Sequence, residues 1–168
     1  KINTKQIPST KAVGGFLFAQ RIAHLSKTFY NRKKIKGGIA VRMILSPTKK
    51  MQSGSGKDRV LHRPQFLEET VQLWEVLREF APYELESAFR INPQLALQAA
   101  CDFQDFSPEA KGEAALFSYI GLAFSNLQPE TFSEEELLFC DETLRILSGF
   151  YGLVRPLDGI QPYRLEMG

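Results

Sequence analysis

The stretch LSGFYGLVRPLDGIQPYRLEMG, residues 147–168, carries the densest set of local structural signals in the chain. Gly149 follows an apolar pattern of helical spacing, and a glycine there is suited to end the helix in a left-handed conformation. Residues 150–154 then have the composition of a short strand, in which Gly152 permits close approach of a neighbouring backbone or ligand. The first half of the stretch therefore predicts a helix that stops and a strand that crosses the core.

The second half of the stretch predicts a turn and an extended segment. Residues 155–159, RPLDG, combine proline, aspartate and glycine, which are typical turn residues. Residues 161–167 then alternate, with Tyr163 on one side and Arg164 and Glu166 on the other. Two arginines and two acids thus fall on a turn and on one face of a strand. Such an arrangement suits the wall of an anion-binding cleft.

Upstream of this stretch, apolar residues spaced by three and four predict several amphipathic helices. We expect a short buried strand at residues 41–45 and a polar, basic, glycine-rich loop at 46–58. Helices are predicted at 64–80, 82–89 and 92–103. A further helix is predicted to follow a cap at Ser107-Pro108, and a last one to run from Glu134 to a stop at Gly149. The segment 115–127 is apolar throughout, and its periodicity does not decide between helix and strand.

A capping box marks the start of the last predicted helix. Ser133 is followed three residues later by Glu136, so each side chain can accept a hydrogen bond from the backbone N–H of the other. The run of acids at 134–136 is thereby explained as helix-start chemistry, because carboxylates favour the positive helix end. Four leucines are expected to point inward from this helix: Leu137, Leu138, Leu144 and Leu147.

Length and composition fit a single globular domain of mixed structure. A chain of 168 residues buries roughly 70% of the surface that its unfolded form exposes, and 43% of these residues are apolar. No apolar run approaches the roughly 18 residues of a membrane span, and the apolar stretch 14–19 is too short for the core of a signal peptide. We predict a cytoplasmic α+β protein, with mixed helices around a small sheet and no membrane contact.

The formal net charge of +2 conceals a sharp asymmetry between two segments. Residues 1–42 contain ten Lys or Arg and no acid, so the remaining 11 basic and all 19 acidic residues give 43–168 a net charge of −8. The basic segment is interpreted in three ways: a nucleic-acid-binding arm, a transit peptide, or upstream DNA translated through a wrong start. Because the chain does not begin with Met, and Met43 opens a strand-like MILSP, we favour the third interpretation. The predicted domain accordingly spans residues 43–168.

The sequence predicts neither a metal site nor a cofactor. Cys101 and Cys140 are too few and too far apart for a disulfide framework or a zinc site. His24 and His62 have no second His, Cys or carboxylate three or four residues on. The loop after the first strand is also not a Walker loop, because no Gly-Lys-Ser/Thr closes it.

The sequence predicts an anion- or DNA-binding site from a set of basic residues, glycines and one hydroxyl. The arginines offer forked donors to phosphate or carboxylate, and the lysines lie in the loop after the first strand. The candidate residues are Lys49, Lys50, Gly149, Gly152, Arg155, Tyr163, Arg164 and Glu166. An alternative interpretation has Arg155, Asp158, Arg164 and Glu166 pairing among themselves, to hold the turn against the strand. No nucleophile–base pair is present, so the sequence favours a binding protein over an enzyme.

Three blocks of sequence resemble the YaaA family of bacterial peroxide-stress proteins. They are MILSPTKKM at 43–51, TFSEEEL at 131–137 and LRILSGFYGLVRPLDGIQPYRLEMG at 144–168, in the family's order and spacing. The resemblance implies a cytosolic protein that limits free iron and thereby oxidative damage under hydrogen peroxide. It also implies a compact α/β fold of its own type, with a positively charged cleft and a helix-hairpin-helix element that binds duplex or branched DNA.

Two departures from the family pattern limit what is carried over. Ile120 and Leu122 stand where many members have a Lys and an Asp, and residues 92–94 replace a charged pair. Family members also continue well beyond Gly168, so we expect the chain to be the N-terminal portion of such a fold, incomplete at its C-terminus. The glycines of SGFYG, 148–152, resemble a helix-hairpin-helix turn, but Pro156 leaves room for at most a three-residue helix, so a strand is the better prediction.

Two functions therefore follow from the sequence and the resemblance. The first is a peroxide-stress protein that limits free iron and binds DNA through a basic cleft. The second is an enzyme or small-molecule-binding protein with an Arg/Lys/Tyr/Glu anion site, whose reaction the sequence leaves open.

Overall fold

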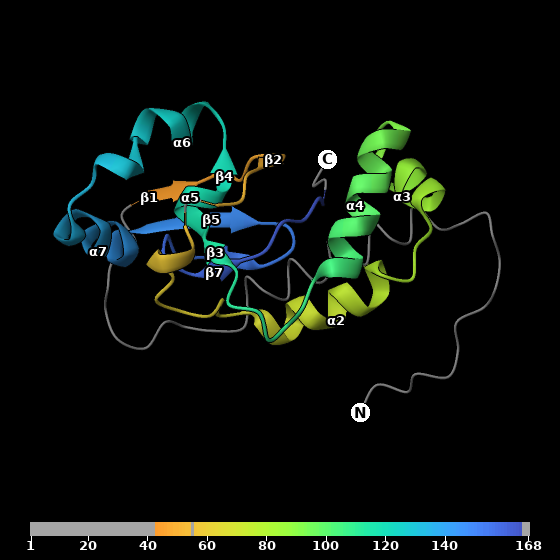
Figure 1. Ribbon diagram of the computed structural model, residues 1–168, viewed down its shortest axis with the longest axis horizontal. Helices are drawn as coiled ribbons and strands as arrows, with labels where there is room; N and C mark the ends of the chain where they lie inside the picture. The colour runs from red at the N-terminus through yellow and green to blue at the C-terminus, as the bar shows by residue number, and fades with distance from the viewer. Residues whose placement is uncertain (1–42, 55, 166–168) are drawn as a thin grey trace.

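A computed structural model gives the fold of residues 43–54 and 56–165. Helices α2, α3 and α4 gather on one side of the molecule, and the strands with α5, α6 and α7 lie on the other (Figure 1). The chain is of the α+β class, as predicted. The basic segment 1–42, its boundary at Met43 and the predicted site residue Glu166 fall at or beyond the limits of the described residues.

Three helices follow one another in the first half of the described chain, and short strands and helices make up the second half. The helices are α2 (Leu67–Leu77), α3 (Pro82–Phe89), α4 (Pro93–Asp105), α5 (Ala115–Ser118), α6 (Leu122–Leu127) and α7 (Glu134–Thr143), with 3-10 helices η1 (Lys57–Arg59) and η2 (Pro129–Thr131). The strands are β1 (Met43–Leu45), β2 (Lys50–Met51), β3 (Glu113–Ala114), β4 (Tyr119–Ile120), β5 (Leu144–Ser148), β6 (Gly152–Val154) and β7 (Gly159–Ile160).

The strands form three small sheets. The first has the order β1-β5-β6, with β1 parallel to β5 and β5 antiparallel to β6. The other two are antiparallel pairs, β2 with β4 and β3 with β7. In the β5–β6 hairpin the Ser148 hydroxyl accepts the N–H of Tyr151 at 2.9 Å, and Gly152 adopts φ +73°, which favours glycine. Local polar contacts and one glycine therefore close this turn.

Two predicted helix starts are confirmed by their caps. At α7, the Ser133 N–H donates to Glu136 at 2.8 Å and the Glu136 N–H donates to the Ser133 hydroxyl at 3.3 Å. The Ser133 N–H and the Ser133 hydroxyl, which donates to Glu136 Oε2 at 3.0 Å, both lower the pKa of the Glu136 carboxyl. At α4, the Asn92 side chain accepts the N–H of Leu95 at 2.9 Å, with Pro93 in the first turn.

The predicted end of the last helix is wrong. The helix stops at Thr143, and residues 144–148 form β5 instead. Leu144 and Ile146 are buried whereas Leu147 is 39% exposed, which is the alternation of a strand. Pairing with β1 and β6 selects this conformation over the helical one, so Gly149 lies in a hairpin turn and is no helix stop. Leu138 is also exposed, contrary to the predicted inward stripe.

Other differences have similar causes. The strand at 43–45 is confirmed but not buried, because β1 pairs only with β5 among the described residues and Ile44 is 61% exposed. The loop at 46–58 contains β2, and α2 begins at Leu67, three residues after Pro64. No helix follows Ser107-Pro108 directly, because the Gln161 side chain binds the N–H and C=O of Ser107 there. Segment 115–127 divides into α5, β4 and α6.

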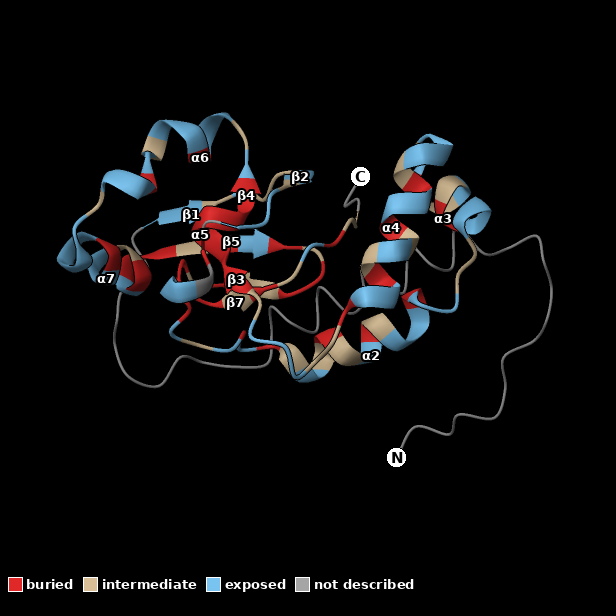
Figure 2. Ribbon diagram, in the orientation of Figure 1, coloured by how far each residue is buried: buried red, intermediate tan, exposed pale blue. Residues whose placement is uncertain are grey.

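Aromatic residues connect the helices to the hairpin in the core. Figure 2 shows buried positions gathered around α5, β3 and β5 and along one side of α4. Phe150 of the β5–β6 turn lies between rings from α4, from the residue that follows it and from the C-terminal segment: Phe103, Phe106, Tyr151 and Tyr163. No helix among residues 43–54 and 56–165 has the length and apolar character needed to cross a bilayer.

Candidate anion- and nucleic-acid-binding site

Four of the predicted site residues line one cavity. The cavity has a volume of about 530 Å³ and lies among β2, α4 and the segment 162–164. Lys49, Lys50, Tyr163 and Arg164 form part of its wall. We call it the cationic cavity, after Lys49, Lys50 and Arg164. The end of the described chain passes between the strands and α4 at this point (Figure 1).

Long-range contacts bring the three cations together. The Arg164 guanidinium Nη1 donates to the backbone carbonyl of Lys49 at 3.2 Å, although the two residues are 115 apart in the sequence. Lys50 pairs with Ile120 in the β2–β4 ladder, and Lys49 directly precedes this strand. Lys49 and Lys50 are exposed and Arg164 is half-buried. Of the four cations that could form one basic cleft, Lys49, Lys50 and Arg164 line this cavity and Arg155 does not.

A buried glutamate fastens the loop that supports the lysines. Both carboxylate oxygens of Glu113 accept the N–H of Gly54, at 2.8 and 2.7 Å, and Gly54 has φ +118°. On the same loop, Gln52 donates from its backbone to Ser118 at 2.8 Å and from its side chain to Phe117 at 3.1 Å. Sequence reasoning missed Glu113, because a single acid gives no signal of what its strand faces.

Helix α4 supplies a different chemistry to the same cavity. Asp102 and Gln98 both line the cavity, and Gln98 Nε2 donates to Asp102 Oδ1 at 2.8 Å. Burial raises the pKa of the Asp102 carboxyl, against the opposing effects of the Gln98 hydrogen bond and the Arg164 charge. These two residues were also missed, although their spacing of four on an amphipathic helix places them on one face.

Tyr163 contributes its ring to the wall, and its hydroxyl is tied inward. The hydroxyl lies 2.8 Å from Ser148 Oγ and 3.0 Å from the Tyr119 hydroxyl. Ser148 Oγ already accepts the N–H groups of Phe150 and Tyr151, so it donates its own proton to Tyr163. Burial raises the pKa values of Tyr163 and Tyr119, so both hydroxyls stay protonated at neutral pH. Tyr163 therefore cannot serve there as a proton acceptor in its ionised form.

The remaining predicted residues are not part of this cavity. Gly149 and Gly152 lie in and beside the β5–β6 turn, between two strands, so this glycine pair does not join two helices. The strand predicted at 150–154 is confirmed over residues 152–154, as β6, while residues 150 and 151 belong to the turn. Arg155 follows β6, and its backbone N–H donates to Asp158 Oδ2 at 2.8 Å. The turn is thus held by a hydrogen bond from the Arg155 backbone to the Asp158 side chain, and no ion pair between Arg155 and Asp158 is found among the described residues.

A second group of charged residues surrounds this turn. His62 Nε2 lies 3.0 Å from Asp141 Oδ2, while Asp141 Oδ1 accepts the N–H of Leu157 at 2.8 Å. His62, isolated in the sequence, therefore has a carboxylate partner from α7. Asp158 is 1% exposed, and its Oδ1 has no hydrogen-bond partner within the described part of the chain. No group of three or more His, Cys, Asp or Glu suited to a metal ion occurs among those same residues.

The state of Asp158 predicts a pH-dependent stability. Burial raises the pKa of its carboxyl to about 6. As pH rises above the usual aspartate pKa, the unfolded chain releases this proton before the folded chain does, so folding loses stability until about pH 6. Asp158→Asn is therefore expected to raise the free energy of unfolding by about 1–2 kcal/mol at pH 7.5.

Urea unfolding at pH 7.5 and pH 4 checks this expectation. The gain from Asp158→Asn should shrink at pH 4, where the wild-type carboxyl is protonated in the folded chain. The exposed Asp105→Asn is the charge-matched control and should change stability little at either pH. A gain for Asp158→Asn that is equal at both pH values, or a loss at pH 7.5, would contradict the assigned ionisation.

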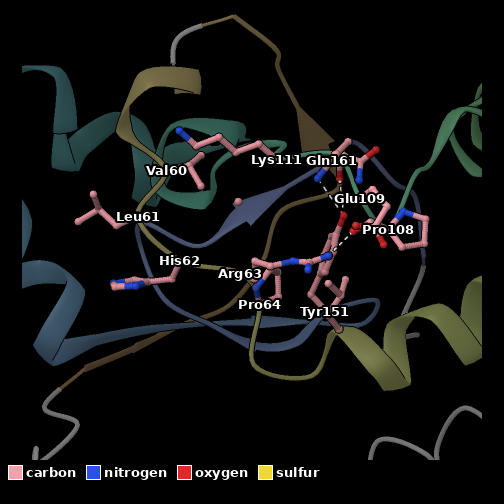
Figure 3. A pocket seen from close by; sticks show the side chains of 13 residues that line it. Val60, Leu61, His62, Arg63, Pro64, Pro108, Glu109, Lys111, Tyr151 and Gln161 are labelled. Carbon is pink, nitrogen blue, oxygen red and sulfur yellow. Dashed lines mark hydrogen bonds between the residues drawn. The ribbon is translucent and has the colours of Figure 1, made fainter.

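A smaller cavity of about 290 Å³ lies on another part of the surface. Figure 3 shows Lys111 above Arg63 in the view, with Tyr151 on the right beside the Arg63 side chain and the His62 ring directed away to the left. Arg63 Nη2 donates to the Pro108 carbonyl at 2.6 Å. None of the predicted site residues that the structure describes lines this cavity. Its exposed Lys111 provides a control position for the cationic cavity.

Comparison with known proteins places the chain in a family. A family model described as Peroxide stress protein YaaA matches residues 41–168. The chain belongs to this family. A relative from Parabacteroides distasonis, named only as UPF0246 protein, is 38% identical over 127 residues, which are 74% of this chain and 50% of the relative. The chain thus spans about half the length of this relative.

Proposed function

We propose that this protein acts in the cytoplasm to protect cells against peroxide, by limiting free iron and oxidative damage, and that it binds DNA through the cationic cavity. Its membership of the peroxide stress protein YaaA family supports the protective role. The observation that carries the DNA-binding part is the convergence of Lys49, Lys50 and Arg164 on one cavity. The limitation of iron rests on the resemblance to the family.

The charge distribution restricts how DNA is bound. Residues 43–168 carry a net charge of −8, so a broad phosphate-binding face is disfavoured and binding depends on a local concentration of cations. Arg164 supplies a planar fork that suits phosphate oxygens, and the two lysines supply mobile point charges. Contacts of this kind position the DNA backbone on the protein and are independent of base sequence.

Loss of the two lysines is expected to weaken DNA binding strongly. Each lost phosphate contact removes the release of about one counterion, so Lys49→Ala with Lys50→Ala should weaken binding by roughly 10- to 100-fold at 0.1 M salt. Fluorescence anisotropy with labelled duplex and branched DNA measures this. Lys111→Ala removes an exposed lysine outside the cavity and should leave the affinity within about threefold. Equal effects of the two substitutions would contradict the proposal.

The same variants connect the cavity to protection. In cells that lack the endogenous protein, the full-length protein with Lys49→Ala and Lys50→Ala should fail to restore survival under hydrogen peroxide, whereas Lys111→Ala should restore it. Free iron, measured by electron paramagnetic resonance, should follow survival. If survival and free iron stay normal after DNA binding is lost, the cavity does not act in protection.

A further inference from the structure

We propose that the cationic cavity receives one nucleotide unit, with its phosphate on the Lys49–Arg164 side and the edge of an unpaired base at Asp102. This inference rests on the proposed function and adds the ligand class of the same cavity. The unit can come from two sources, a free nucleotide or an unpaired nucleotide within DNA.

Three kinds of wall carry the inference. Lys49, Lys50 and Arg164 provide positive charge for a phosphate, as described above. Apolar side chains provide a surface for the face of a base: Met51, Leu95, Ile120 and Pro162. Asp102 and Gln98 on α4 provide hydrogen-bonding groups. A nucleotide has a phosphate, a flat apolar ring face and a polar base edge. The cations match the phosphate, the apolar side chains match the ring face, and Asp102 and Gln98 match the base edge.

Asp102 is the residue that a phosphate-only site does not explain. A carboxylate repels phosphate, so the presence of Asp102 in the same cavity as the cations is not accounted for by phosphate binding alone. Gln98 occupies Asp102 Oδ1, while no hydrogen bond to Oδ2 is found within the described part of the chain. A free carboxylate oxygen accepts from an exocyclic amino group such as that of cytosine. Asp102 therefore suits the base edge and excludes the phosphate from its own side.

The cavity has the size of a small-ligand site, and a base within a duplex cannot enter it. Its volume of about 530 Å³ lies within the range of roughly 300–1,000 Å³ typical of small-ligand sites. A base pair within a duplex has both its faces stacked and its Watson–Crick edge occupied, so it can present neither to the cavity. Only an unpaired or extruded nucleotide can reach Asp102 while its phosphate stays with the cations.

Two duplexes of equal length and equal phosphate number test the inference with the full chain. One contains a C·G pair at its centre, and the other contains the same cytosine opposite an abasic site. We expect the unpaired cytosine to bind about tenfold more tightly, and dCMP to displace it at concentrations at which inorganic phosphate does not. Asp102→Ala should abolish the preference and leave the affinity for the paired duplex equal or higher. Asp105→Ala, on the same helix but outside the cavity lining, should keep the preference.

The outcomes separate this inference from the proposed function. If Lys49→Ala with Lys50→Ala weakens both duplexes but wild type shows no preference, the cavity binds DNA and the nucleotide inference is wrong. If dCMP binds in an Asp102-dependent manner and neither duplex binds, the inference holds for free nucleotides and DNA binding is wrong. Identical behaviour of Asp102→Ala and Asp105→Ala would overturn the role of Asp102.

Discussion

Phe150→Ala is expected to lower the free energy of unfolding by about 3–5 kcal/mol. The Phe150 ring is fully buried, and its centroid lies 5.0–5.8 Å from four other aromatic rings. It stacks on Tyr163 with an interplanar angle of 27° and meets Tyr151 edge-on at 77°. Its removal leaves a cavity where the β5–β6 turn meets α4, so contacts on both sides are lost together.

Urea unfolding followed by circular dichroism measures this loss. Phe139→Ala removes the same side chain from a position that is 53% exposed on α7 and should cost less than about 1 kcal/mol. Phe150→Leu keeps most of the apolar volume and should fall between the two, so the expectation stays measurable if the alanine variant does not fold. Equal losses for Phe150→Ala and Phe139→Ala would show that the ring cluster is not the centre of the core.

Gly159→Ala is expected to lower the free energy of unfolding by about 2–4 kcal/mol. A Cβ atom at Gly159 would overlap the backbone carbonyl oxygen of Lys111 and lie 2.8 Å from Val60 Cγ1. Gly159 pairs with Ala114 in the β3–β7 ladder and donates its N–H to the His62 carbonyl at 2.9 Å. A backbone obstacle cannot rotate away, so the ladder must separate.

Gly54→Ala is the comparison for this expectation. A Cβ atom there meets nothing within 4 Å, but φ is +118°, so the substitution costs backbone strain alone, about 1–2 kcal/mol. Thermal or urea unfolding should therefore rank Gly159→Ala clearly below Gly54→Ala in stability. The reverse order would contradict the close approach of the 111 and 159 backbones.

Local signals in the sequence predicted local structure well. The Ser133–Glu136 capping box and the Asn92 cap are confirmed because their chemistry is complete within four residues. Residues 144–148 were predicted as helix because their strand state depends on β1, which is distant in the sequence. Spacing along the chain contains no information on such a partner.

The residues of the candidate site were likewise predicted only in part. Lys49, Lys50, Tyr163 and Arg164 were predicted from residue type, and the fold brings them to one cavity. Arg155 has the same chemistry but lies at the turn after β6, because the chain reverses between 155 and 159. Asp102 was not predicted, since only the packing of α4 brings it to the same cavity as the cations. Residue chemistry thus predicted the cationic donors of the cavity and missed its carboxylate acceptor.

The salt dependence of duplex binding shows whether Lys49, Lys50 and Arg164 contact phosphates. Association constants are measured between 50 and 200 mM salt for wild type and for Lys49→Gln/Lys50→Gln/Arg164→Gln. If the three cations neutralise phosphates, the slope of log K against log salt should be shallower in the variant by about 2–3. Parallel lines for the two proteins would show that DNA is bound elsewhere, or not through these charges. That result would contradict DNA binding through the cationic cavity.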